Sequence, residues 1–475
     1  MRRSHWIILV IGIATIACVV PPRLMDRDDA RLRFVVWGMP FEDRLFEDVY
    51  AREFEALHPG VVVQYEKYVD VADKYFAWHT IGTGADVMRV RITDYHGLVA
   101  RGVLTPLDEF IEHPDPEIGL SAERQADFLP AVWDPLEVDG ARYALPSDNA
   151  QYGLYYNKAI FDAYNAAHRE DQLEYPHADW TWDDLREAAE KLTIVDERGR
   201  VTQYGIDFFL WAWPFMAFFE QAGGELWDEE GTTTLIDSPA GVEALQLIVD
   251  LLPHAVSARS PEQVETATGP DKLFATGQTA MLLDGSWRAP FLELTNSDLD
   301  FAIAPLPRGK RPGVVSGSVV WAISAHSRNK EMAWRMIRWM TDFEQALRYW
   351  DMLRVAPPAS RRVIESEEFR ATSGLVGDGG EVIIPAMPRE KWKECGEWLL
   401  YGIRLHPMTG EAPAFVPVAP YQADLEDKIG TMLSRAVAPT RSQSLEDLLR
   451  EAADAVHAII DRDRRARGLS VVDRE

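Results

Sequence analysis

Cysteine is scarce in this chain, which has two cysteines among 475 residues. They are Cys18, within an apolar stretch near the N-terminus, and Cys395. If cleavage removes the apolar stretch, Cys395 has no partner for a disulfide within the chain, and a zinc site made of thiolates is excluded. Hydrophobic cores must therefore stabilise the protein.

Basic residues are in deficit as well. The chain has 49 lysines and arginines against 76 aspartates and glutamates, so its formal net charge is -27. Such a surface repels a phosphate backbone, which argues against nucleic acid as a partner and disfavours polyanionic substrates. The acidity favours solubility, and an uncharged ligand such as a sugar is indifferent to the net field.

Several sequence motifs of enzymes are absent. The chain has no internal repeat, no glycine-rich phosphate loop, no Gly-x-Ser-x-Gly elbow and no His-Glu-x-x-His pair, and its histidines are scattered. These motifs would have indicated phosphate binding, a nucleophilic serine or a metal site. We therefore predict no catalytic residue, no metal site and no cofactor.

The N-terminal segment is typical of an exported protein. Two arginines precede an uncharged apolar run, residues 6–20, that is too short to favour a membrane-spanning helix. Thr15 and Ala17 are small residues at the positions expected before a cleavage site at Cys18. We expect residues 1–29 to be a signal peptide, or a lipoprotein anchor with its tether, and the protein to be periplasmic or extracellular.

Cys18 leaves three outcomes open. Thr15-Ile16-Ala17-Cys18 resembles a bacterial lipoprotein signal, although a large aliphatic residue usually stands where Thr15 does. Lipidation of the Cys18 thiol would anchor the protein at a membrane face without a spanning helix. The alternatives are a cleaved, secreted chain and an uncleaved N-terminal anchor.

The rest of the chain is long enough for two or more lobes, because one hydrophobic core stops growing at about 250 to 300 residues. Its 47% hydrophobic and 26% charged residues are typical of a globular protein. It opens with a strand over residues 32–37, a helix that ends at His58-Pro59-Gly60, and a strand over residues 61–65. This order predicts a parallel sheet and an α/β fold.

Polar residues follow the third predicted strand, residues 84–90. Arg91, Thr93 and Asp94 lie at its carboxyl end, before the next helix. Ligands of open parallel sheets sit outside the carboxyl ends of the strands. These three side chains are therefore candidates for ligand contact, and the alternative is that they are solvated turn residues.

Indole side chains gather in two parts of the sequence. Trp211, Trp213 and Trp227 lie beside a predicted strand-to-helix turn, and a second set lies mostly near predicted strand ends: Trp37, Trp133, Trp287 and Trp321. A flat aromatic face suits the C–H face of a sugar ring, while acids and amides bind its hydroxyls. The alternative for each ring is core packing. For Trp287, which follows a buried strand, we favour ligand contact.

Two positions are predicted to carry the chain between lobes. Asp139-Gly140 is a hairpin turn between residues 133–138 and 142–145, and the polar pair Asp148 and Asn149 then marks the first crossing. Gly317, between two apolar strands, marks the second. Such residues are consistent with a hinge, and also with a plain loop.

Further helices are predicted in two parts of the chain. Thr181 is a good N-cap for a helix whose first turn holds Asp183 and Asp184, so these acids are predicted to cap and not to catalyse. Toward the C-terminus, helical periodicity covers residues 392–401, 421–437 and 445–464.

Five passages, taken in order, resemble one protein family. They are Gly84-Ala85-Asp86-Val87 with residues 100–108; Ala144-Leu145-Pro146 with residues 154–158; residues 181–185; residues 274–281 through Gly285-Ser286-Trp287; and residues 322–324 through 329–334. Each motif alone is weak. Their order and spacing resemble the family 1 extracellular solute-binding proteins, which deliver oligosaccharides to ATP-driven importers. Residues 373–420 depart from that pattern.

The resemblance implies an α/β, periplasmic-binding-protein-like fold, in which two lobes enclose a ligand cleft and the chain crosses between them three times. The expected N-terminal lobe is 30–149 plus 317–365, and the expected C-terminal lobe is 150–316 plus 366–467, followed by a tail at 468–475. The third hinge is expected between residues 363 and 373.

The resemblance also implies site residues. It carries over Trp287, Trp213, the polar stretch after the third strand and the loop from Trp37 to Glu42. With the positions argued above, the predicted ligand-binding set is Trp37, Glu42, Arg91, Thr93, Asp94, Asp148, Asn149, Trp211, Trp213, Trp287 and Gly317.

The implied function is that of an extracytoplasmic solute-binding protein, and not of an enzyme. Such a protein captures a sugar or oligosaccharide by lobe closure and delivers it to the membrane permease of an ABC importer. Two alternatives stay open. One is a secreted glycosidase or lyase with paired carboxylates among Glu42, Asp94, Asp148 and Glu225. The other is a ligand-binding partner of a membrane sensor.

Overall fold

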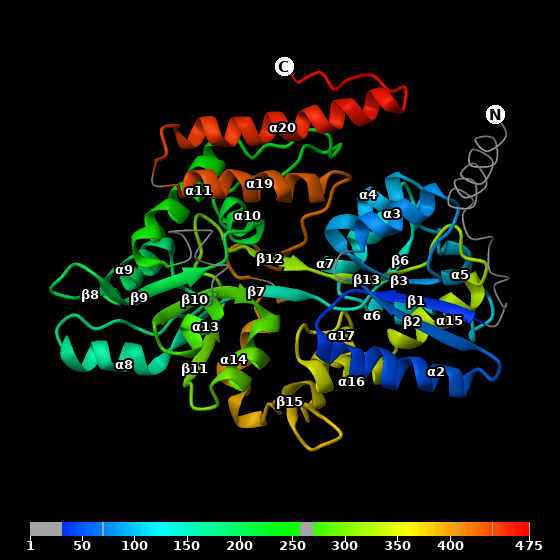
Figure 1. Cartoon of the computed structure of the whole chain (residues 1–475), viewed down its shortest axis with the longest axis horizontal. Helices are drawn as coiled ribbons and strands as arrows, with labels where there is room; N and C mark the ends of the chain where they lie inside the picture. The colour runs from blue at the N-terminus through cyan, green and yellow to red at the C-terminus, as the bar shows by residue number, and fades with distance from the viewer. Residues whose placement is uncertain (1–30, 69–70, 257–268, 405, 439, 475) are drawn as a thin grey trace, which may run out of the picture.

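The computed structural model describes residues 31–68, 71–256, 269–404, 406–438 and 440–474. The expected leader and Cys18 lie outside the described residues. Figure 1 shows two groups of helices and strands side by side, joined in the middle near β7 and β12. Each group is built around its own sheet. The predicted α/β class with two lobes is confirmed.

The sheet of the first lobe has the strand order β2-β1-β3-β13-β6. Its parallel part is formed by β1 (Arg31–Val36), β2 (Val62–Lys67) and β3 (Val87–Arg91), while β13 (Val319–Ala322) runs antiparallel to β3 and to β6 (Ala144–Pro146). The predicted opening strand, helix and strand are therefore confirmed. The helical elements before residue 137 are η1 (Pro40–Glu42), η2 (Arg44–Ala51), α2 (Arg52–Leu57), α3 (Ala72–Thr80), α4 (Ile92–Ala100), α5 (Asp108–Ile111), α6 (Ala122–Asp127), α7 (Pro130–Trp133) and η3 (Asp134–Leu136).

The sheet of the second lobe has the order β16-β12-β7-β10-β9-β8, with β11 also paired to β7. Its long central strand β7 (Ala150–Asn157) is buried along its whole length and runs antiparallel to β10 (Thr279–Gly285). The other strands are β8 (Ile194–Val195), β9 (Val201–Phe208), β11 (Phe301–Ala304), β12 (Val314–Gly317) and β16 (Ala414–Phe415). The helical elements of this stretch are α8 (Lys158–Ala167), α9 (Trp182–Lys191), α10 (Ala212–Gln221), α11 (Pro239–Leu251), η4 (Leu252–His254), α13 (Pro270–Ala275), η6 (Ser286–Arg288) and α14 (Ala289–Thr295).

After β13 the chain is mainly helical. Its elements are α15 (Lys330–Met340), α16 (Phe343–Leu353), α17 (Arg361–Glu365), η7 (Glu368–Arg370), the hairpin β14 (Leu375–Val376) and β15 (Val382–Ile384), η8 (Arg389–Lys391), α18 (Trp392–Cys395), η9 (Glu397–Leu400), α19 (Gln422–Ala436) and α20 (Leu445–Ala466). In Figure 1 α19 and α20 lie side by side at the top of the molecule. Both were predicted from their helical periodicity.

Two local predictions were wrong. Residues 133–138 were expected as a strand, but α7 ends at Trp133, η3 follows, and only β4 (Glu137–Val138) pairs with β5 (Ala141–Arg142). Pro130 and Pro135 stand at the starts of these helical turns, where proline is favoured. The helix expected over residues 392–401 is divided at Gly396 into α18 and η9, because glycine weakens a helix interior.

The predicted capping of α9 is confirmed. The Thr181 hydroxyl accepts a hydrogen bond from the backbone N–H of Asp184, and the Asp184 carboxylate accepts one from the backbone N–H of Thr181. This reciprocal pair satisfies backbone donors that the first turn of a helix leaves without partners. The Asp184 carboxylate therefore caps the N-terminus of α9.

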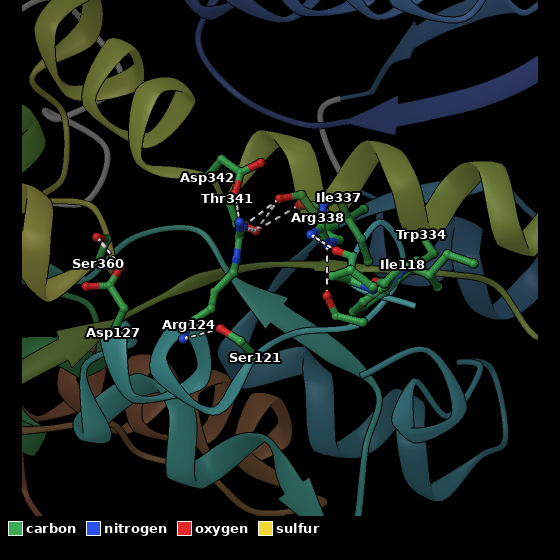
Figure 2. A network of polar contacts seen from close by, with 12 residues as sticks. Ile118, Ser121, Arg124, Asp127, Trp334, Ile337, Arg338, Thr341, Asp342 and Ser360 are labelled. Carbon is green, nitrogen blue, oxygen red and sulfur yellow. Dashed lines mark hydrogen bonds and ion pairs between the residues drawn. The ribbon is translucent and has the colours of Figure 1, made fainter. Parts of the chain in front are cut away.

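A polar network fastens α6 to the C-terminal end of α15, as Figure 2 shows. The Arg124 guanidinium donates to the Arg338 carbonyl at 2.7 Å and to the Thr341 hydroxyl at 3.2 Å, and it forms an ion pair with Asp342. The Asp127 carboxylate accepts a hydrogen bond of 2.6 Å from the Ser360 hydroxyl, the N-cap of α17. The partly buried charged side chains of this network hold three helices of the first lobe together.

Three segments of the chain meet where the two sheets adjoin. The Ser147 N–H donates to the Val319 carbonyl at 2.8 Å, and the Asn149 N–H donates to the Pro357 carbonyl at 2.7 Å. The Ala359 N–H donates back to the Ser147 carbonyl at 3.1 Å. The connections β6 to β7 and β12 to β13, together with residues 357–359, therefore form one hydrogen-bonded junction.

Among the described residues, no helix has both the length and the apolar character needed to cross a membrane. In the same part of the chain, no group of three or more histidine, cysteine, aspartate or glutamate side chains is placed to hold a metal ion.

Candidate functional site

Three of the predicted tryptophans come together in one aromatic cluster with Tyr152 of β7. The ring centroids of Trp213 and Trp287 are 5.5 Å apart, those of Trp211 and Trp213 are 6.1 Å apart, and those of Trp211 and Trp287 are 6.0 Å apart. Tyr152 lies between 6.1 and 6.4 Å from all three. We call these four residues the aromatic cluster.

The elements that carry these rings come from distant parts of the sequence. Trp211 is the N-cap residue of α10 and Trp213 lies in its first turn, while Trp287 lies in η6 directly after β10. Two glycines make room for the rings. A Cβ atom built on Gly317 would lie 2.3 Å from the Trp213 ring, and one on Gly285 would lie 2.2 Å from the Trp287 ring. Gly317 therefore supports the cluster by its lack of a side chain.

Hydrogen bonds fix the orientation of the cluster. The Trp211 indole N–H donates to the Tyr152 hydroxyl at 3.1 Å, and this hydroxyl donates to the Leu283 carbonyl at 2.9 Å. Burial raises the pKa of Tyr152 far above its usual value, so the hydroxyl stays protonated. Trp211 is 37% exposed, and Trp287 is partly buried against two hydrophobic clusters, both of which include residues of the second lobe. Through Trp213 the cluster lies against Gly317, beside the junction between the lobes, with one indole open to solvent.

Trp37 and Glu42 lie at the carboxyl end of β1, around the buried Arg89. The Arg89 guanidinium forms an ion pair of 2.8 Å with Glu42, donates to the Trp37 carbonyl at 2.6 Å, and lies 4.9 Å from the Trp37 ring centroid. Burial acts to lower the pKa of Arg89, but attraction to Glu42, together with the influence of Tyr349 and Asp148, outweighs it, so the net pKa is raised. Within the described residues, no ring contact joins Trp37 to the aromatic cluster.

Arg91, Thr93 and Asp94 lie where the sequence predicted, at the end of β3 and the start of α4. The Arg91 guanidinium forms an ion pair of 2.7 Å with Asp94. Asp94 and Thr93 are each 8% exposed, and the Arg91 side chain is half-exposed. The Ile92 N–H donates to the Ser318 carbonyl at 2.9 Å, which ties this strand end to the junction between the lobes.

A second wall, from the C-terminal part of the chain, faces Asp94. The Trp227 indole N–H donates to the Gln422 side chain at 2.8 Å, and the Gln422 amide donates to the Glu426 carboxylate at 3.3 Å. Burial raises the pKa of Glu426 to about 7, and the Asp94 carboxylate adds to this rise. The helices α4 and α19 are in contact, and the Asp94 carboxylate is close enough to Glu426 to affect its pKa.

Gln422 and Glu426 were missed in the sequence because they lie beyond the motifs of the family resemblance. The helical pattern of α19 was visible, but that pattern does not specify which element covers a given face. An acid and an amide four residues apart, on one face of a helix, were the signal that could have found them.

Asp148 and Asn149 lie inside the junction between the lobes, where they are 1% and 0% exposed. The Asp148 carboxylate accepts hydrogen bonds from the Val319 N–H at 2.9 Å and the Tyr349 hydroxyl at 3.2 Å, while Asn149 is hydrogen-bonded to the Ser316 hydroxyl. Burial raises the pKa of Asp148 to about 7. In this structure both side chains hold crossing segments together.

Two of the tryptophans that were predicted to lie near strand ends belong to the hydrophobic core. Trp321 is 2% exposed and its ring centroid lies 5.6 Å from that of Phe34, and Trp133 is stacked on Phe128 at 4.9 Å. The interpretation of these two rings as cleft residues was wrong. Trp321 is in the middle of β13, where both faces of the sheet are covered, and Trp133, which was predicted to begin a strand, ends the helix α7.

A surface cavity of about 460 Å³ adjoins the Arg124 network of Figure 2 and is lined by residues that include Arg124, Asp127 and Arg362. None of the aromatic cluster lines it. Because its walls come from the first lobe alone, ligand bound there would not bring the two lobes together.

Two known proteins that are similar to this chain are named for the oligosaccharides that they bind. The maltotriose-binding protein of Pyrococcus abyssi is 23% identical over 379 residues, which are 75% of this chain and 74% of that protein. The arabinooligosaccharide-binding protein of Halalkalibacterium halodurans is 25% identical over 339 residues, which are 68% of this chain and 67% of that protein.

Solved structures resemble the fold over nearly the whole chain. An ABC substrate-binding protein from Listeria monocytogenes, in complex with cycloalternan, has a TM-score of 0.71 and 20% sequence identity and covers 93% of this chain and 99% of that chain. The cyclic alpha-maltosyl-1,6-maltose binding protein from Arthrobacter globiformis has a TM-score of 0.66 and 19% identity, covering 91% and 99%. These likenesses identify the fold as periplasmic-binding-protein-like.

The family model described as bacterial extracellular solute-binding protein matches residues 42–346, which are more than half of the chain. That range includes β3, the aromatic cluster and both connections of the junction, and so covers parts of both lobes. The protein therefore belongs to the family of bacterial extracellular solute-binding proteins.

Proposed function

We propose that the protein binds a sugar or oligosaccharide between its lobes and delivers it to the membrane permease of an ABC importer. The observation that carries this proposal is the aromatic cluster, in which three indoles from two segments meet beside Gly317 at the junction between the lobes. Stacked indoles with nearby acids and amides suit a ligand that has both C–H faces and hydroxyls. The names of the similar proteins, which are maltotriose-binding and arabinooligosaccharide-binding, support the same ligand class.

In this proposal the two walls of the site come from different lobes. Trp211, Trp213 and Trp287 supply apolar faces from the second lobe, while Arg91 and Asp94 supply polar groups from the first. Thr93, Trp37 and Glu42 extend the first wall, and Gln422 and Glu426 extend the second. Charged acceptors form the stronger hydrogen bonds to hydroxyl donors, so the acids orient the ligand and the rings supply buried area.

Lobe closure supplies the mechanism. A ligand held by both walls favours the closed form because only that form contacts it from both sides. We place the hinges at the junction, with Asp148 and Asn149 on one crossing and Gly317 on the next. The proposed lobes are 30–149 plus 317–365 and 150–316 plus 366–467. The hydrogen bonds among the crossing segments would then be the ones that rearrange.

Export follows from membership of the family, whose members are extracellular. We further propose that the leader is a signal peptide and that Cys18 is a site of lipidation, which would keep the protein beside its permease. Intact mass measurement of the exported protein tests this. A diacylated N-terminal Cys18 is the expected result, and a chain cleaved at another position without lipid would contradict it.

A thermal-shift screen tests the ligand class. The screen compares maltotriose, arabino-oligosaccharides, monosaccharides, polyols and oligopeptides, because a ligand present at 100 times its dissociation constant stabilises the native state by about 2.7 kcal/mol. We expect a rise in melting temperature with oligosaccharides, confirmed by calorimetry. A shift with oligopeptides alone would overturn the proposal.

The same ligands separate binding from hydrolysis. Of the acids named for an enzyme, Glu42 is ion-paired with Arg89 and Asp148 is enclosed in the junction. Prolonged incubation of the protein with an oligosaccharide that binds is therefore expected to release no new reducing ends. If new reducing ends appear with the unmodified protein and do not appear with Asp94→Asn, the protein is instead a glycosidase.

A further inference from the structure

A pair of aromatic rings joins elements of the two lobes. Phe41 lies in η1, between β1 and β2 of the first sheet, and Phe291 lies in α14, between β10 and β11 of the second sheet. Their ring centroids are 5.3 Å apart, and the ring planes are inclined by 59°. This separation is within the range that aromatic pairs favour, so the two rings are in direct contact.

The turn that carries Phe41 is fastened to the first lobe. The Glu42 carboxylate accepts a hydrogen bond of 2.7 Å from the Met39 N–H and forms its ion pair with Arg89. Gly38 has a φ of +151°, and a Cβ atom there would lie 2.3 Å from the Glu42 carboxylate, so this close turn requires glycine. Because Arg89 belongs to β3, the turn that presents Phe41 is bound to the first sheet.

The segment that carries Phe291 is fastened to the second lobe. Phe291 follows Trp287 of the aromatic cluster by four residues, and the Arg288 guanidinium lies 6.0 Å from its ring centroid. Arg288 forms ion pairs of 2.6 Å with the buried Asp284 of β10 and of 2.8 Å with Asp271 of α13. Each ring of the pair therefore stands on an element that ion pairs bind to its own lobe.

The hairpin of β14 and β15 also touches both lobes. Asp378, in its turn, forms an ion pair of 2.8 Å with Arg44 of η2, three residues after Phe41, and β15 packs against α14. An ion pair at the protein surface contributes little to stability. The contact of Phe41 with Phe291 is therefore the stronger of these two links.

We propose that Phe41 and Phe291 form a lobe latch, an aromatic contact that favours the closed form before any ligand binds. This inference rests on the proposed function, since lobe closure is the motion it concerns. The rings belong to different lobes, so separation of the lobes breaks their contact and exposes apolar surface to water. The latch therefore raises the closed fraction of the free protein and, with it, the apparent affinity for ligand.

A latch changes affinity in a way that a ligand contact does not. It acts on the equilibrium between the open and closed forms, so its loss lowers the affinity for every ligand by the same factor. A ring that touched the sugar would instead contribute a factor that depends on which sugar is bound. The two rings act through one contact, so removal of the second ring after the first has no further effect.

Spin-label distances measured without any ligand test the latch. Labels on Ala77→Cys of α3 and Ala163→Cys of α8, both at exposed positions, report the separation of the lobes in a Cys18→Ser background. The buried Cys395 stays unlabelled, because burial raises its pKa to about 12 and a thiol reacts as the thiolate. In Phe291→Ala we expect the ratio of closed to open forms to fall about fivefold.

Phe110→Ala is the matched control for these distances. The Phe110 ring is half-buried, as Phe41 is, and its centroid lies 5.5 Å from that of Trp334, but both of these rings belong to the first lobe. The control should keep the distance distribution of the unmodified protein. An unchanged distribution in Phe291→Ala would overturn the latch.

Calorimetry with a short and a long oligosaccharide from the screen completes the test. Phe41→Ala, Phe291→Ala and the double variant should each lose about fivefold in affinity for both sugars. A loss that differs between the sugars, or a double variant that loses the product of the two single effects, contradicts the latch. The distance measurement needs no ligand, so the latch and the proposed sugar binding can fail separately.

Discussion

The Trp287 ring is central to the proposed site because it contacts Tyr152 and both other indoles of the cluster. It lies 5.5 Å from Trp213 and 6.0 Å from Trp211, and it packs against each hydrophobic core. Its position depends on the absence of a side chain at Gly285.

Trp287→Ala should weaken oligosaccharide binding by about 2 kcal/mol, or roughly 30-fold, since truncation of a buried aromatic anchor has this effect. Isothermal titration calorimetry with a ligand from the screen measures the change. Trp78→Ala, which removes a partly buried indole outside the cluster, is the control and should bind normally. Unchanged affinity in Trp287→Ala would reject the stacking role.

The raised pKa of Asp148 predicts that the stability of the protein depends on pH. Burial raises its pKa from 3.8 to about 7, so the native state binds this proton more tightly than the unfolded state does. The stabilisation is complete below about pH 4 and is lost as the pH rises through 7. The free energy of unfolding should therefore fall between pH 5 and pH 7.5. In Asp148→Asn this fall should be smaller by about 1 to 3 kcal/mol, because the amide does not titrate.

Urea unfolding at several pH values checks this prediction. Asp73→Asn, at an exposed carboxylate of α3, is the comparison variant and should follow the unmodified protein. If Asp148→Asn shows the same pH profile as the unmodified protein, Asp148 is ionised in the native state throughout this range.

At the scale of elements, the contact of α4 with α19 is the part of the lobe boundary that a small change can test. Gly97→Ala would place a methyl group 3.1 Å from the Pro420 carbonyl oxygen and 3.0 Å from the Arg101 guanidinium. The flexible arginine can move, but the backbone carbonyl can move only if the helices separate. We expect ligand affinity to fall about fivefold and the melting temperature of the free protein to change little, because each lobe keeps its core.

Calorimetry and thermal unfolding measure the two effects of Gly97→Ala. Gly430→Ala, on α19 where a Cβ atom would meet nothing within 4 Å, is the matched control and should leave affinity unchanged. Full affinity in Gly97→Ala would mean that the bound state does not need this close approach.

At the scale of the whole molecule, the net charge of -27 predicts a response to salt. Like charges over the surface repel one another, and salt screens this repulsion over a Debye length of about 10 Å at 0.1 M. The melting temperature should therefore rise between 0.02 and 0.3 M sodium chloride. Affinity for an uncharged sugar should change less than twofold over the same range. A falling melting temperature would show that surface ion pairs outweigh the repulsion.

Much of the fold follows from patterns that are local in the sequence. Alternating strands and helices predicted the α/β class, and the periodicity of residues 421–437 and 445–464 predicted α19 and α20. The placement of Arg91, Thr93 and Asp94 at the end of β3 followed from the same patterns. Local patterns suffice here because helix and strand periods are set by neighbouring residues.

The sequence by itself determined the element order, the acidic surface and the chemical types in the site. Only the tertiary structure decided that Trp211, Trp213 and Trp287 meet while Trp133 and Trp321 are core, that Asp148 is enclosed in the junction, and that α19 packs against α4. These outcomes depend on packing between segments far apart in the chain, and a side chain's own sequence neighbours do not specify which distant element will cover it.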